Sequence, residues 1–238
     1  MPNLVVIIPA LDEILSLREL LPKILSELEQ LKDYSSEILV VVGMESTELD
    51  GKEILALGGV PVIRGPSNTF GDAIRTGFEQ AKTYTPQYIL IMDADGSHNP
   101  RTIPRLLGTI AGGDFDIVIA SRYTVGGGSH NAIPLKLMSK VLNFTYSRVL
   151  GIDAKDVSTN YKIYRAELLA DLKLACQNFD IVEEILLEIK RIRSGNLDIK
   201  EIPDHFEKRI YGTSKRNLAL FILSYITTLI RLRFRRIS

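Results

Sequence analysis

The chain has 238 residues, 45% of them hydrophobic and 24% charged, which suits one large globular domain or one domain with an appendage. Basic and acidic side chains number 29 each, so the overall charge points to no class of partner. The single cysteine, Cys176, excludes an internal disulfide. Because no histidine lies near it at metal-ligand spacing, we expect a buried thiol in a reducing compartment.

The first half of the chain alternates predicted strands with predicted helices. Continuous apolar, β-branched runs predict strands, and apolar residues at helical spacing predict helices. The strands are expected at 4–10, 36–43, 60–65, 88–95 and 115–123, and the helices at 15–32, 49–59, 70–84 and 99–113. This alternation predicts an α/β fold with a mostly parallel sheet, whose ligands collect beyond the carboxyl ends of the strands.

The second half is expected to complete the same domain rather than to form another. A flexible, glycine-rich loop is predicted at 124–131, followed by helices at 135–151 and 180–195. A late strand at 198–209 is placed at the edge of the sheet, because Pro203 cannot donate a ladder hydrogen bond. The chain shows no internal repeat.

The segment 218–238 is interpreted as a helical appendage to a domain that covers 1–217. Its apolar run, Leu218–Ile230, is shorter than the roughly 20 residues that a helix needs to span a bilayer. Two interpretations stay open: a helix in the membrane interface with arginines at the headgroups, or a helix packed on the domain. The first predicts a peripheral protein at the cytoplasmic face of a membrane, and the second a cytoplasmic one. The N-terminal stretch 1–13 is interpreted as a strand rather than a signal peptide.

An Asp-x-Asp motif, Asp93 and Asp95, ends the fourth predicted strand. Two carboxylates separated by one residue can hold Mg²⁺ or Mn²⁺ while diphosphate oxygens take other positions on the metal. As an isolated tripeptide the motif more often forms a turn, because Asp and Gly both favour one. Its place at the carboxyl end of an apolar strand favours the metal site.

Other ionisable residues give weaker signals. Glu183 and Glu184 are candidate bases for a hydroxyl acceptor, although residues of this kind more often lie on a solvated helix face. The three histidines show no metal-ligand spacing. His98 is near enough to Asp93 and Asp95 to contact a phosphate, but a histidine satisfied within the turn is the simpler interpretation.

Six segments, in the same order, resemble family 2 glycosyltransferases, and most of all the branch that contains dolichyl-phosphate mannose synthase and related polyprenyl-phosphate glycosyltransferases. They read VVIIPALDE, FGDAIRTGFEQA, MDADGSHNP, IASRYTVGGG, DVSTNYKIYR and IPDHFEKRIYGTSK, and together they span nearly the whole chain. Each segment is modest by itself, and their order makes the resemblance specific. It implies the GT-A fold, a mostly parallel α/β sheet flanked by helices.

The resemblance also implies roles for individual residues of the donor half. It places eight of them around the nucleotide sugar: Pro9, Leu11, Glu13, Val42, Gly71, Asp93, Ala94 and Asp95. The first three would line the base and ribose pocket. Asp93 and Asp95 would hold Mg²⁺ or Mn²⁺ and the diphosphate, with Asp95 the more direct ligand. Ser97 stands where some relatives have glutamine.

In the acceptor half, the resemblance places Arg122, Asp156, Arg209 and Lys215, and it implies that the three cations, with Asp95, carry catalysis. These cations would reduce the repulsion between an acceptor phosphate and the donor diphosphate, and arginine binds phosphate through two parallel hydrogen bonds. A phosphate is ionised at neutral pH and needs no general base, so the cations favour a phosphate acceptor.

Alternatives remain for these acceptor residues. Arg122 could be a solvated residue at the end of a strand. Arg209 and Lys215 could belong to a generic basic tail, and Asp156 could cap a helix or form a turn.

The chain departs from the family pattern mainly in the donor half. Segment LVVVGMESTELDG has Val42 and Gly43 where relatives usually have acids, one of which typically reads the base. Glu45 or Glu48 could substitute in part. The base, GDP or UDP, therefore stays open.

Smaller departures affect the recognition of donor and acceptor. Asp12 replaces the usual asparagine, and NTFGDA keeps Gly71 but not a pair of glycines. Asn160 stands where glycine is common.

The sequence therefore predicts a metal-dependent, inverting glycosyltransferase that moves mannose or another hexose from a nucleotide sugar to a polyprenyl phosphate. Expected partners are the donor, the acceptor and a membrane surface, with no nucleic acid and a possible homo-oligomer. One alternative is a family 2 enzyme with a sugar hydroxyl acceptor and a base such as Asp156 or Glu184. The other is a non-catalytic homologue that binds a nucleotide sugar.

Overall fold

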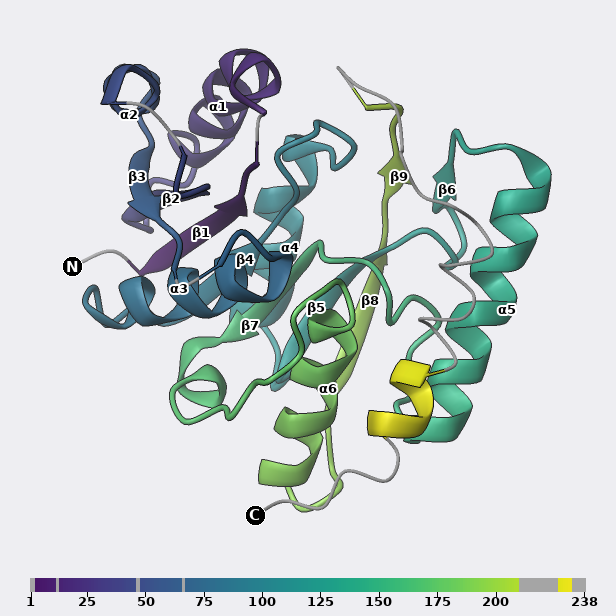
Figure 1. Cartoon of the computed structure of the whole chain (residues 1–238). Coiled ribbons are helices and arrows are strands. Elements are labelled where there is room, and N and C mark those ends of the chain that lie inside the picture. The colour runs from purple at the N-terminus through teal and green to yellow at the C-terminus, as the bar shows by residue number, and fades with distance from the viewer. Residues whose placement is uncertain (1–2, 12, 46–47, 66, 210–226, 233–238) are drawn as a thin grey trace.

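A seven-stranded sheet, in the order β3-β2-β1-β4-β7-β5-β8, organises the computed structural model, which describes residues 3–11, 13–45, 48–65, 67–209 and 227–232 (Figure 1). Its strands are β1 (Leu4–Pro9), β2 (Ser36–Val42), β3 (Val60–Ile63), β4 (Tyr88–Ile91), β5 (Ile117–Ser121), β7 (Lys162–Arg165) and β8 (Ile199–Pro203). Six strands run parallel, and β7 runs antiparallel between β4 and β5. The predicted α/β class and the edge position of β8 are confirmed.

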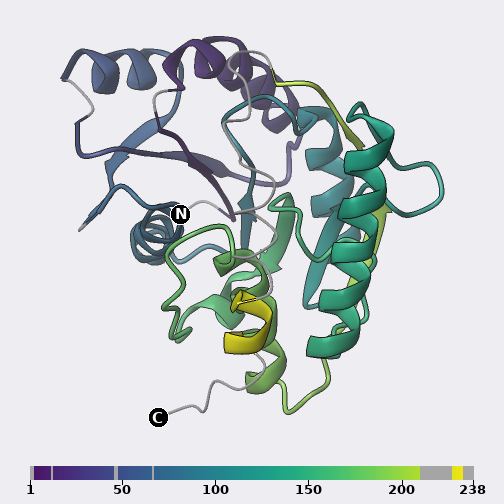
Figure 2. The ribbon, with the colours of Figure 1, turned by 45° about the vertical axis from the view of Figure 1, so that its right-hand side comes forward.

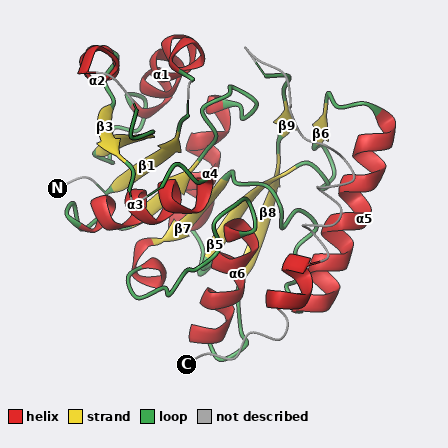
Figure 3. Ribbon diagram, in the orientation of Figure 1, coloured by secondary structure: helices red, strands yellow, loops and turns green. Residues whose placement is uncertain are grey.

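Helices cover both faces of the sheet (Figure 3). They are α1 (Ile14–Leu28), α2 (Glu48–Ala56), α3 (Phe70–Lys82), α4 (Ile103–Ala111), α5 (Ile133–Leu150) and α6 (Ile181–Ile192), with 3₁₀ turns at Pro100–Thr102 and Ala166–Leu169. Helices α1 and α4 share one hydrophobic core, and α3 and α6 share the other with part of α5. The two cores lie on opposite faces, so the fold has three layers.

The apolar runs of the sequence follow from this arrangement. In β1, Leu4, Val6 and Ile8 face the core of α1 and α4, whereas Val5 and Ile7 face the core of α3 and α6. Successive side chains of a strand point to opposite faces, so a strand covered on both sides is apolar throughout. The runs in β2, β4 and β5 follow the same rule.

Strand β7 brings the later half of the chain to the ligand-binding edge of the sheet. Its first residue, Lys162, pairs with Ile91 at the end of β4 and with Ile119 near the end of β5. Because β7 runs antiparallel, its beginning lies where its parallel neighbours end. The residues just before Lys162 therefore arrive beside those that follow β4 and β5.

The glycine-rich segment after β5 is more ordered than predicted. It carries β6 (Gly128–Ser129), which pairs in parallel with β9 (His205–Phe206). A Cβ on Gly127 would lie 2.4 Å from the carbonyl oxygen of Ser121, so the glycine allows a close backbone approach. Helix α5 follows this loop and forms one flank of the molecule (Figure 2).

The described part of the C-terminal tail, residues 227–232, is a helix packed on the domain at the start of α6. Leu232 is buried in the core of α3 and α6. Thr228 Oγ1 donates to Asp180 Oδ2 at 3.2 Å, and Arg231 forms an ion pair with the same carboxylate. These six residues match the interpretation in which the tail packs on the protein. Among the residues described, none of the helices combines the length and the apolar composition needed to cross a bilayer.

Candidate active site

The Asp-x-Asp motif forms a turn directly beyond β4, at the carboxyl ends of the parallel strands. Asp95 Oδ1 accepts hydrogen bonds from the backbone N–H of Ser97 at 2.9 Å and from its hydroxyl at 2.5 Å. Asp95 Oδ2 lies 3.0 Å from Nε of Arg209. The turn interpretation is therefore right for the backbone, and the same turn presents a carboxylate oxygen to a cation.

Asp93 is held between two side chains that carry unsatisfied polar atoms. Its Oδ1 accepts a hydrogen bond from Asn160 Nδ2 at 3.1 Å, and its backbone N–H donates to His98 Nδ1 at 3.0 Å. His98 Nε2 lies 3.8 Å from Asp93 Oδ2. Both His98 Nε2 and Asn160 Oδ1 are buried without a hydrogen-bond partner among the described residues. The expectation of a satisfied turn histidine is thus met at only one of its two nitrogens.

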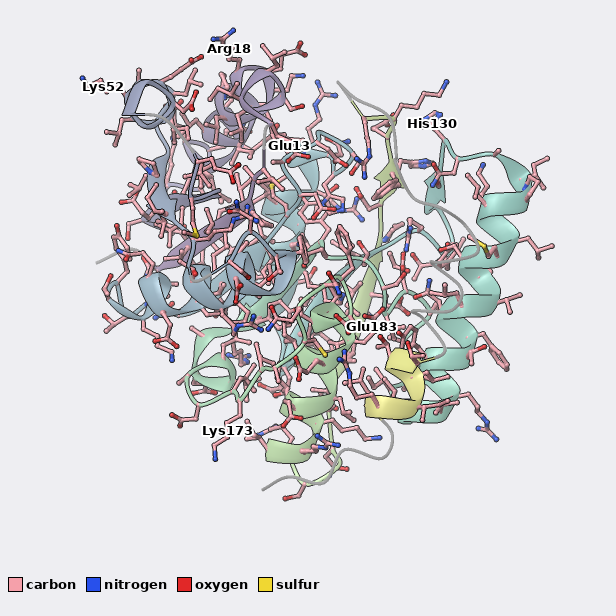
Figure 4. All side chains as sticks on the ribbon, viewed as in Figure 1. Glu13, Arg18, Lys52, His130, Lys173 and Glu183 are labelled. Atoms are coloured by element: carbon pink, nitrogen blue, oxygen red, sulfur yellow. The ribbon has the colours of Figure 1, made fainter. Side chains whose placement is uncertain are left out.

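Glu13, just before α1, adds a third carboxylate to this region (Figure 4). Burial and then the charges of Asp95 and Asp93 raise the pKa of the Glu13 carboxyl to about 7, while Arg209 and Arg64 oppose the shift. Carboxylates repel one another when they are desolvated together. The positive charge near Glu13, Asp93 and Asp95 therefore does not balance the negative charge of the three carboxylates.

These residues fit a divalent metal ion. Asp93 and Asp95 supply the carboxylate oxygens that Mg²⁺ and Mn²⁺ prefer, and Arg209 already places a cation on Asp95. Within the described ranges no group of three His, Cys, Asp or Glu residues could enclose a metal. Mg²⁺ is usually bound by one or two carboxylates together with substrate phosphates, so two ligands suit it.

A small cavity of about 80 Å³ lies between the first turns of α1 and the end of β2. Its lining includes Leu11, Glu13 and Val42, which the resemblance placed at the nucleotide sugar, together with Glu45 and Asp50. The carboxylates of Glu45 and Asp50 could accept hydrogen bonds from a nucleotide base or from ribose hydroxyl groups. Asp12 and the Glu48 side chain lie outside the described parts of the chain.

Pro9 and Gly43 shape this pocket from its edge. Pro9 is the last residue of β1 and is buried one residue before the lining begins. A Cβ on Gly43 would lie 2.9 Å from Leu11 Cδ1, so the glycine lets the two loops meet. Ala94, between the two aspartates, is buried in the core of α1 and α4.

Arg64, which no sequence motif marks as a site residue, ties together the loops that carry the pocket. Its buried guanidinium donates to the carbonyl oxygens of Ala10 at 2.5 Å, of Val41 and Val42 at 3.2 Å, and of Thr69 at 3.3 Å. Only an interrupted apolar run, VPVIRG, could have marked it in the sequence. Its planar guanidinium holds together the carboxyl ends of β1 and β2 and the segment before α3, through hydrogen bonds to their carbonyl oxygens.

Gly71, predicted to contact the nucleotide sugar, has a packing role in the structure. It lies in the first turn of α3, and its N–H donates to the carbonyl of Gln177 at 2.7 Å. A Cβ there would lie 2.2 Å from the carbonyl oxygen of Cys176. The glycine therefore allows α3 to abut the loop before α6.

Arg122 and Asp156 form a buried pair at the end of β5. Arg122 donates from Nε at 2.8 Å and from Nη2 at 2.6 Å to the two carboxylate oxygens, and its backbone N–H donates at 2.9 Å. Burial opposes the charged guanidinium, but the hydrogen bonds and charge of Asp156 outweigh it and raise the pKa of Arg122 above its usual value. The solvated alternative for Arg122 is therefore wrong, and Asp156 is neither a helix cap nor a free base.

A further cation stands beside this pair. Lys140, on α5, has its Nζ 5.9 Å from the centroid of the Tyr123 ring, and Arg122 Cζ lies 5.2 Å from the same centroid. No local sequence pattern marks Lys140, because the contact depends on how α5 turns back over the loop. Lys215 lies outside the described residues.

Lys162, at the start of β7, holds the loop that leads to the site. Its Nζ donates to the carbonyl of Val157 at 3.1 Å and to that of Thr159. Burial lowers the pKa of the Lys162 ammonium, and burial raises the pKa of the nearby Glu183 carboxyl. Both side chains are buried, so neither is exposed to a substrate.

Neither Glu183 nor Glu184 lies on a solvated face, so that expectation is wrong for both. Glu184 is completely buried, and its carboxylate accepts hydrogen bonds from the backbone N–H groups of Ala175 at 3.0 and 3.1 Å and of Cys176 at 2.8 Å. It therefore stabilises the loop before α6. Residues 181–187 of α6 are buried without interruption, which the helical spacing alone could not reveal.

Comparisons with known proteins give one family, two named relatives and a set of similar structures. The family described as Glycosyl transferase family 2 matches residues 5–173. The chain is 36% identical over 148 residues to a polyprenol monophosphomannose synthase of Mycolicibacterium smegmatis, covering 61% of this chain and 55% of that one. It is 31% identical over 154 residues to an undecaprenyl-phosphate mannosyltransferase of Micrococcus luteus, covering 64% and 62%.

The chain thus spans between about half and three fifths of the length of these two relatives. A crystal structure of glucosyl-3-phosphoglycerate synthase from Mycobacterium tuberculosis with Mg²⁺ and uridine diphosphate superposes with a TM-score of 0.68, at 19% identity, covering all of this chain and 81% of the other. At that identity the likeness concerns the fold.

Proposed function

The chain belongs to glycosyl transferase family 2 and has the GT-A fold, and we propose from this that it is a metal-dependent, inverting glycosyltransferase that moves mannose or another hexose from a nucleotide sugar to a polyprenyl phosphate. Two relatives named for polyprenol and undecaprenyl phosphate support the acceptor. The observation that carries the proposal is that Asp156, the best-placed candidate base, is locked by Arg122, while Lys140 lies against the Tyr123 ring that Arg122 also contacts. A phosphate acceptor needs cations and no base.

In the donor half, Asp93 and Asp95 would hold a divalent cation together with the donor diphosphate. Solved relatives in fold contain Mg²⁺ or Mn²⁺ with uridine diphosphate, which supports a divalent metal. When bound, the metal would stabilise the charge on the departing nucleoside diphosphate. The cavity lined by Leu11, Glu13 and Val42 would take the base or ribose.

In the acceptor half, Arg122 and Lys140 would receive the acceptor phosphate. Asp156 occupies the Nε and Nη2 edge of the Arg122 guanidinium, so the phosphate would meet its remaining Nη1 and the Lys140 ammonium. Arg209 stands on the donor side, at Asp95. Fixed cations lower the repulsion between the two phosphate groups as they approach one carbon atom.

The transfer follows from these two halves. A phosphate oxygen of the acceptor attacks the anomeric carbon from the face opposite the diphosphate. A new carbon–oxygen bond forms as the bond to the diphosphate oxygen breaks, so the anomeric configuration inverts. The leaving diphosphate keeps the electron pair, and no proton has to be removed from the nucleophile.

We also propose that the protein works at a membrane surface, with α5 as the face that meets the lipid. Four large apolar side chains, one stripe along this helix, are between 59% and 80% exposed: Ile133, Leu137, Val141 and Phe144. Lys136, Lys140 and Arg148 lie on the same helix, which suits an anionic membrane. The tail helix at 227–232, by contrast, is engaged with the domain.

The membrane proposal is tested by vesicle sedimentation. Replacing Ile133 and Phe144 with serine should weaken binding to vesicles containing phosphatidylglycerol by at least about tenfold, because each apolar side chain contributes on the order of 1.5–3 kcal/mol when it is fully buried. Leu55→Ser is the control and should have no effect, because Leu55 is a large apolar residue on α2 that is also mostly exposed, at 57%. Equal loss in both variants, or none in either, would contradict the assignment of α5.

The transferase proposal is tested with the full chain, undecaprenyl phosphate in detergent, and GDP-mannose, UDP-glucose or UDP-galactose. We expect transfer that requires Mn²⁺ or Mg²⁺, stops on chelation, and falls by at least about a hundredfold in Asp95→Ala. A product with inverted anomeric configuration would agree with the mechanism. Transfer that survives both chelation and Asp95→Ala would overturn the metal-dependent mechanism, and no transfer from any donor would overturn the proposed function.

A further inference from the structure

Asn160 is one of the smaller departures of this chain from the pattern that it resembles, in which glycine is common at that place. The structure puts an amide there, in contact with Asp93 at 3.1 Å. Asn160 is buried, with only 5% of the residue exposed. A buried polar group costs free energy unless it forms hydrogen bonds, so both ends of the Asn160 amide are expected to have partners.

The contact with Asp93 fixes which way the amide points. A carboxylate only accepts hydrogen bonds, so the NH₂ group must face Asp93 and the oxygen must face away from it. That oxygen, Oδ1, is buried and has no partner in the described part of the structure. A strong acceptor is therefore held in a fixed direction beside the proposed metal ligand and left unused.

The position of Asn160 lies between the two halves of the proposed reaction. On one side is Asp93, which would face the donor diphosphate. On the other, the same loop carries Asp156 and Ser158, which both bind Arg122. A donor sugar is bonded to the diphosphate and must meet the acceptor phosphate at its anomeric carbon. Its ring therefore has to lie between these groups, next to the Asn160 amide.

We propose that Asn160 Oδ1 accepts a hydrogen bond from a hydroxyl group of the donor sugar, so that Asn160 is a specificity-determining residue of this chain. The inference rests on the proposed function, and it adds a contact that a relative with glycine cannot make. The sugar enters along the side of Asp93, whose side chain is 28% exposed. A sugar that lacks a hydroxyl in the right orientation leaves the buried oxygen unpaired, which is the strongest way for a site to reject it.

Two simpler roles for the amide have to be separated from this one. Asn160 could serve only to orient Asp93, or its oxygen could bind the metal ion directly. In both cases, removing the amide would change the affinity for the nucleoside diphosphate and its metal, whether or not a sugar is attached. A contact with the sugar, in contrast, changes only the difference in affinity between the nucleotide sugar and the free diphosphate.

The experiment measures that additional affinity by calorimetry, as the ratio of dissociation constants of the free diphosphate and the nucleotide sugar. The full chain with Mn²⁺ is titrated with GDP and GDP-mannose, and with UDP, UDP-glucose and UDP-galactose. In Asn160→Gly we expect the ratio for the preferred sugar to fall about tenfold, which corresponds to about 1.4 kcal/mol, and the preference among sugars to shrink. The free diphosphate should bind within about twofold of its wild-type affinity.

A matched control loosens the same loop without removing the acceptor. Asn143 accepts a hydrogen bond from the backbone N–H of Ser158 at 2.9 Å. Asn143→Ala should lower the melting temperature and leave the sugar ratio unchanged. An equal loss of affinity for diphosphate and nucleotide sugar in Asn160→Gly would overturn the inference in favour of a role at Asp93 or the metal.

The remaining outcomes separate this inference from the proposed function. If the wild-type chain binds a diphosphate but no nucleotide sugar more tightly, the sugar contact is wrong while the nucleotide site stands. If the ratio of the two dissociation constants is the same in Asn160→Gly as in the wild type, the sugar contact is also wrong while the nucleotide site stands. If the wild-type chain binds none of these nucleotides, the proposed function fails, and the inference fails with it.

Discussion

Arg122 and Asp156, 34 residues apart in the chain, meet as a buried pair in which the carboxylate accepts hydrogen bonds from two guanidinium nitrogens and from the Arg122 backbone N–H. The pair joins the end of β5 to the loop that precedes β7. Glu201, on β8, accepts hydrogen bonds from the backbone N–H groups of Lys155 and Asp156 in turn. Three strands are thus tied together where the acceptor is proposed to bind.

The first prediction concerns this pair. Asp156→Ala leaves a buried, charged guanidinium without its partner, and we expect the free energy of unfolding to fall by about 3–5 kcal/mol. Asp156→Asn keeps an acceptor oxygen and should cost less. Urea denaturation measures both. A loss below about 1 kcal/mol in Asp156→Ala would mean that water replaces the carboxylate and that the pair is open to solvent.

The second prediction concerns pH. The pKa of Glu13 is about 7 in the folded protein against 4.5 for an ordinary glutamate, so between these values the folded state holds more protons than the unfolded state. This contribution to stability is therefore present below pH 4.5 and is lost as the pH rises through 7. Glu13→Gln does not titrate. We expect the variant to melt at a similar temperature to the wild type at pH 4.5 and at a higher temperature at pH 8.

Added metal gives the control for this second prediction. Mn²⁺ bound at Asp93 and Asp95 would neutralise the charges that repel ionised Glu13, so at pH 8 it should reduce the difference between variant and wild type. Thermal unfolding at both pH values, with and without Mn²⁺, supplies the four comparisons. A difference in melting temperature that does not depend on pH would show that Glu13 acts through packing alone.

The third prediction compares two helical glycines. Gly71→Ala places a Cβ 2.2 Å from the Cys176 carbonyl oxygen, so the start of α3 must shift, and we expect a loss of at least about 1–3 kcal/mol. Gly108, inside α4, has no atom within 4 Å of its would-be Cβ. Gly108→Ala should stabilise the protein by about 0.5–1 kcal/mol. Opposite signs in chemical denaturation are the expected result, and two losses of similar size would contradict the close packing at Gly71.

The fourth prediction tests Glu184 as a base. Glu184→Ala leaves the N–H groups of Ala175 and Cys176 unpaired and should cost about 1–3 kcal/mol, whereas Glu184→Gln keeps an acceptor and should cost less. Because the carboxylate is occupied by the backbone, the pH dependence of transfer by the folded variants should not change. A pH profile that loses one limb in Glu184→Gln would instead favour a hydroxyl acceptor and a catalytic base.

The sequence predicted most strongly those features that depend on local pattern and burial. Strands β1, β2, β4 and β5 are apolar throughout because both faces are covered, and α1 and α4 show helical spacing because one side of each is buried. The position of Asp93 and Asp95 followed from the end of such a strand. All of these signals lie within a few residues of the feature that they predict.

Features that depend on distant partners were not predictable in this way. Strand β7 is short, and its place in the sheet is set by pairing with β4, which lies more than 70 residues earlier. The pairing of Arg122 with Asp156 and the hydrogen bonds of Arg64 to carbonyl groups join separate loops. Burial of Glu183 and Glu184 depends on the tertiary packing of α6 against the sheet.

The antiparallel course of β7 also sets an order of events during synthesis. Asp93 and Asp95 leave the ribosome well before Asn160 and Lys162, so the nascent chain exposes the two carboxylates before their supporting loop exists. Until β7 is inserted, the facing edges of β4 and β5 have unpaired backbone N–H and C=O groups, which can pair with strands of other chains. A chain interrupted before residue 162 would therefore lack the support of Asp93 and carry an aggregation-prone gap in the centre of its sheet.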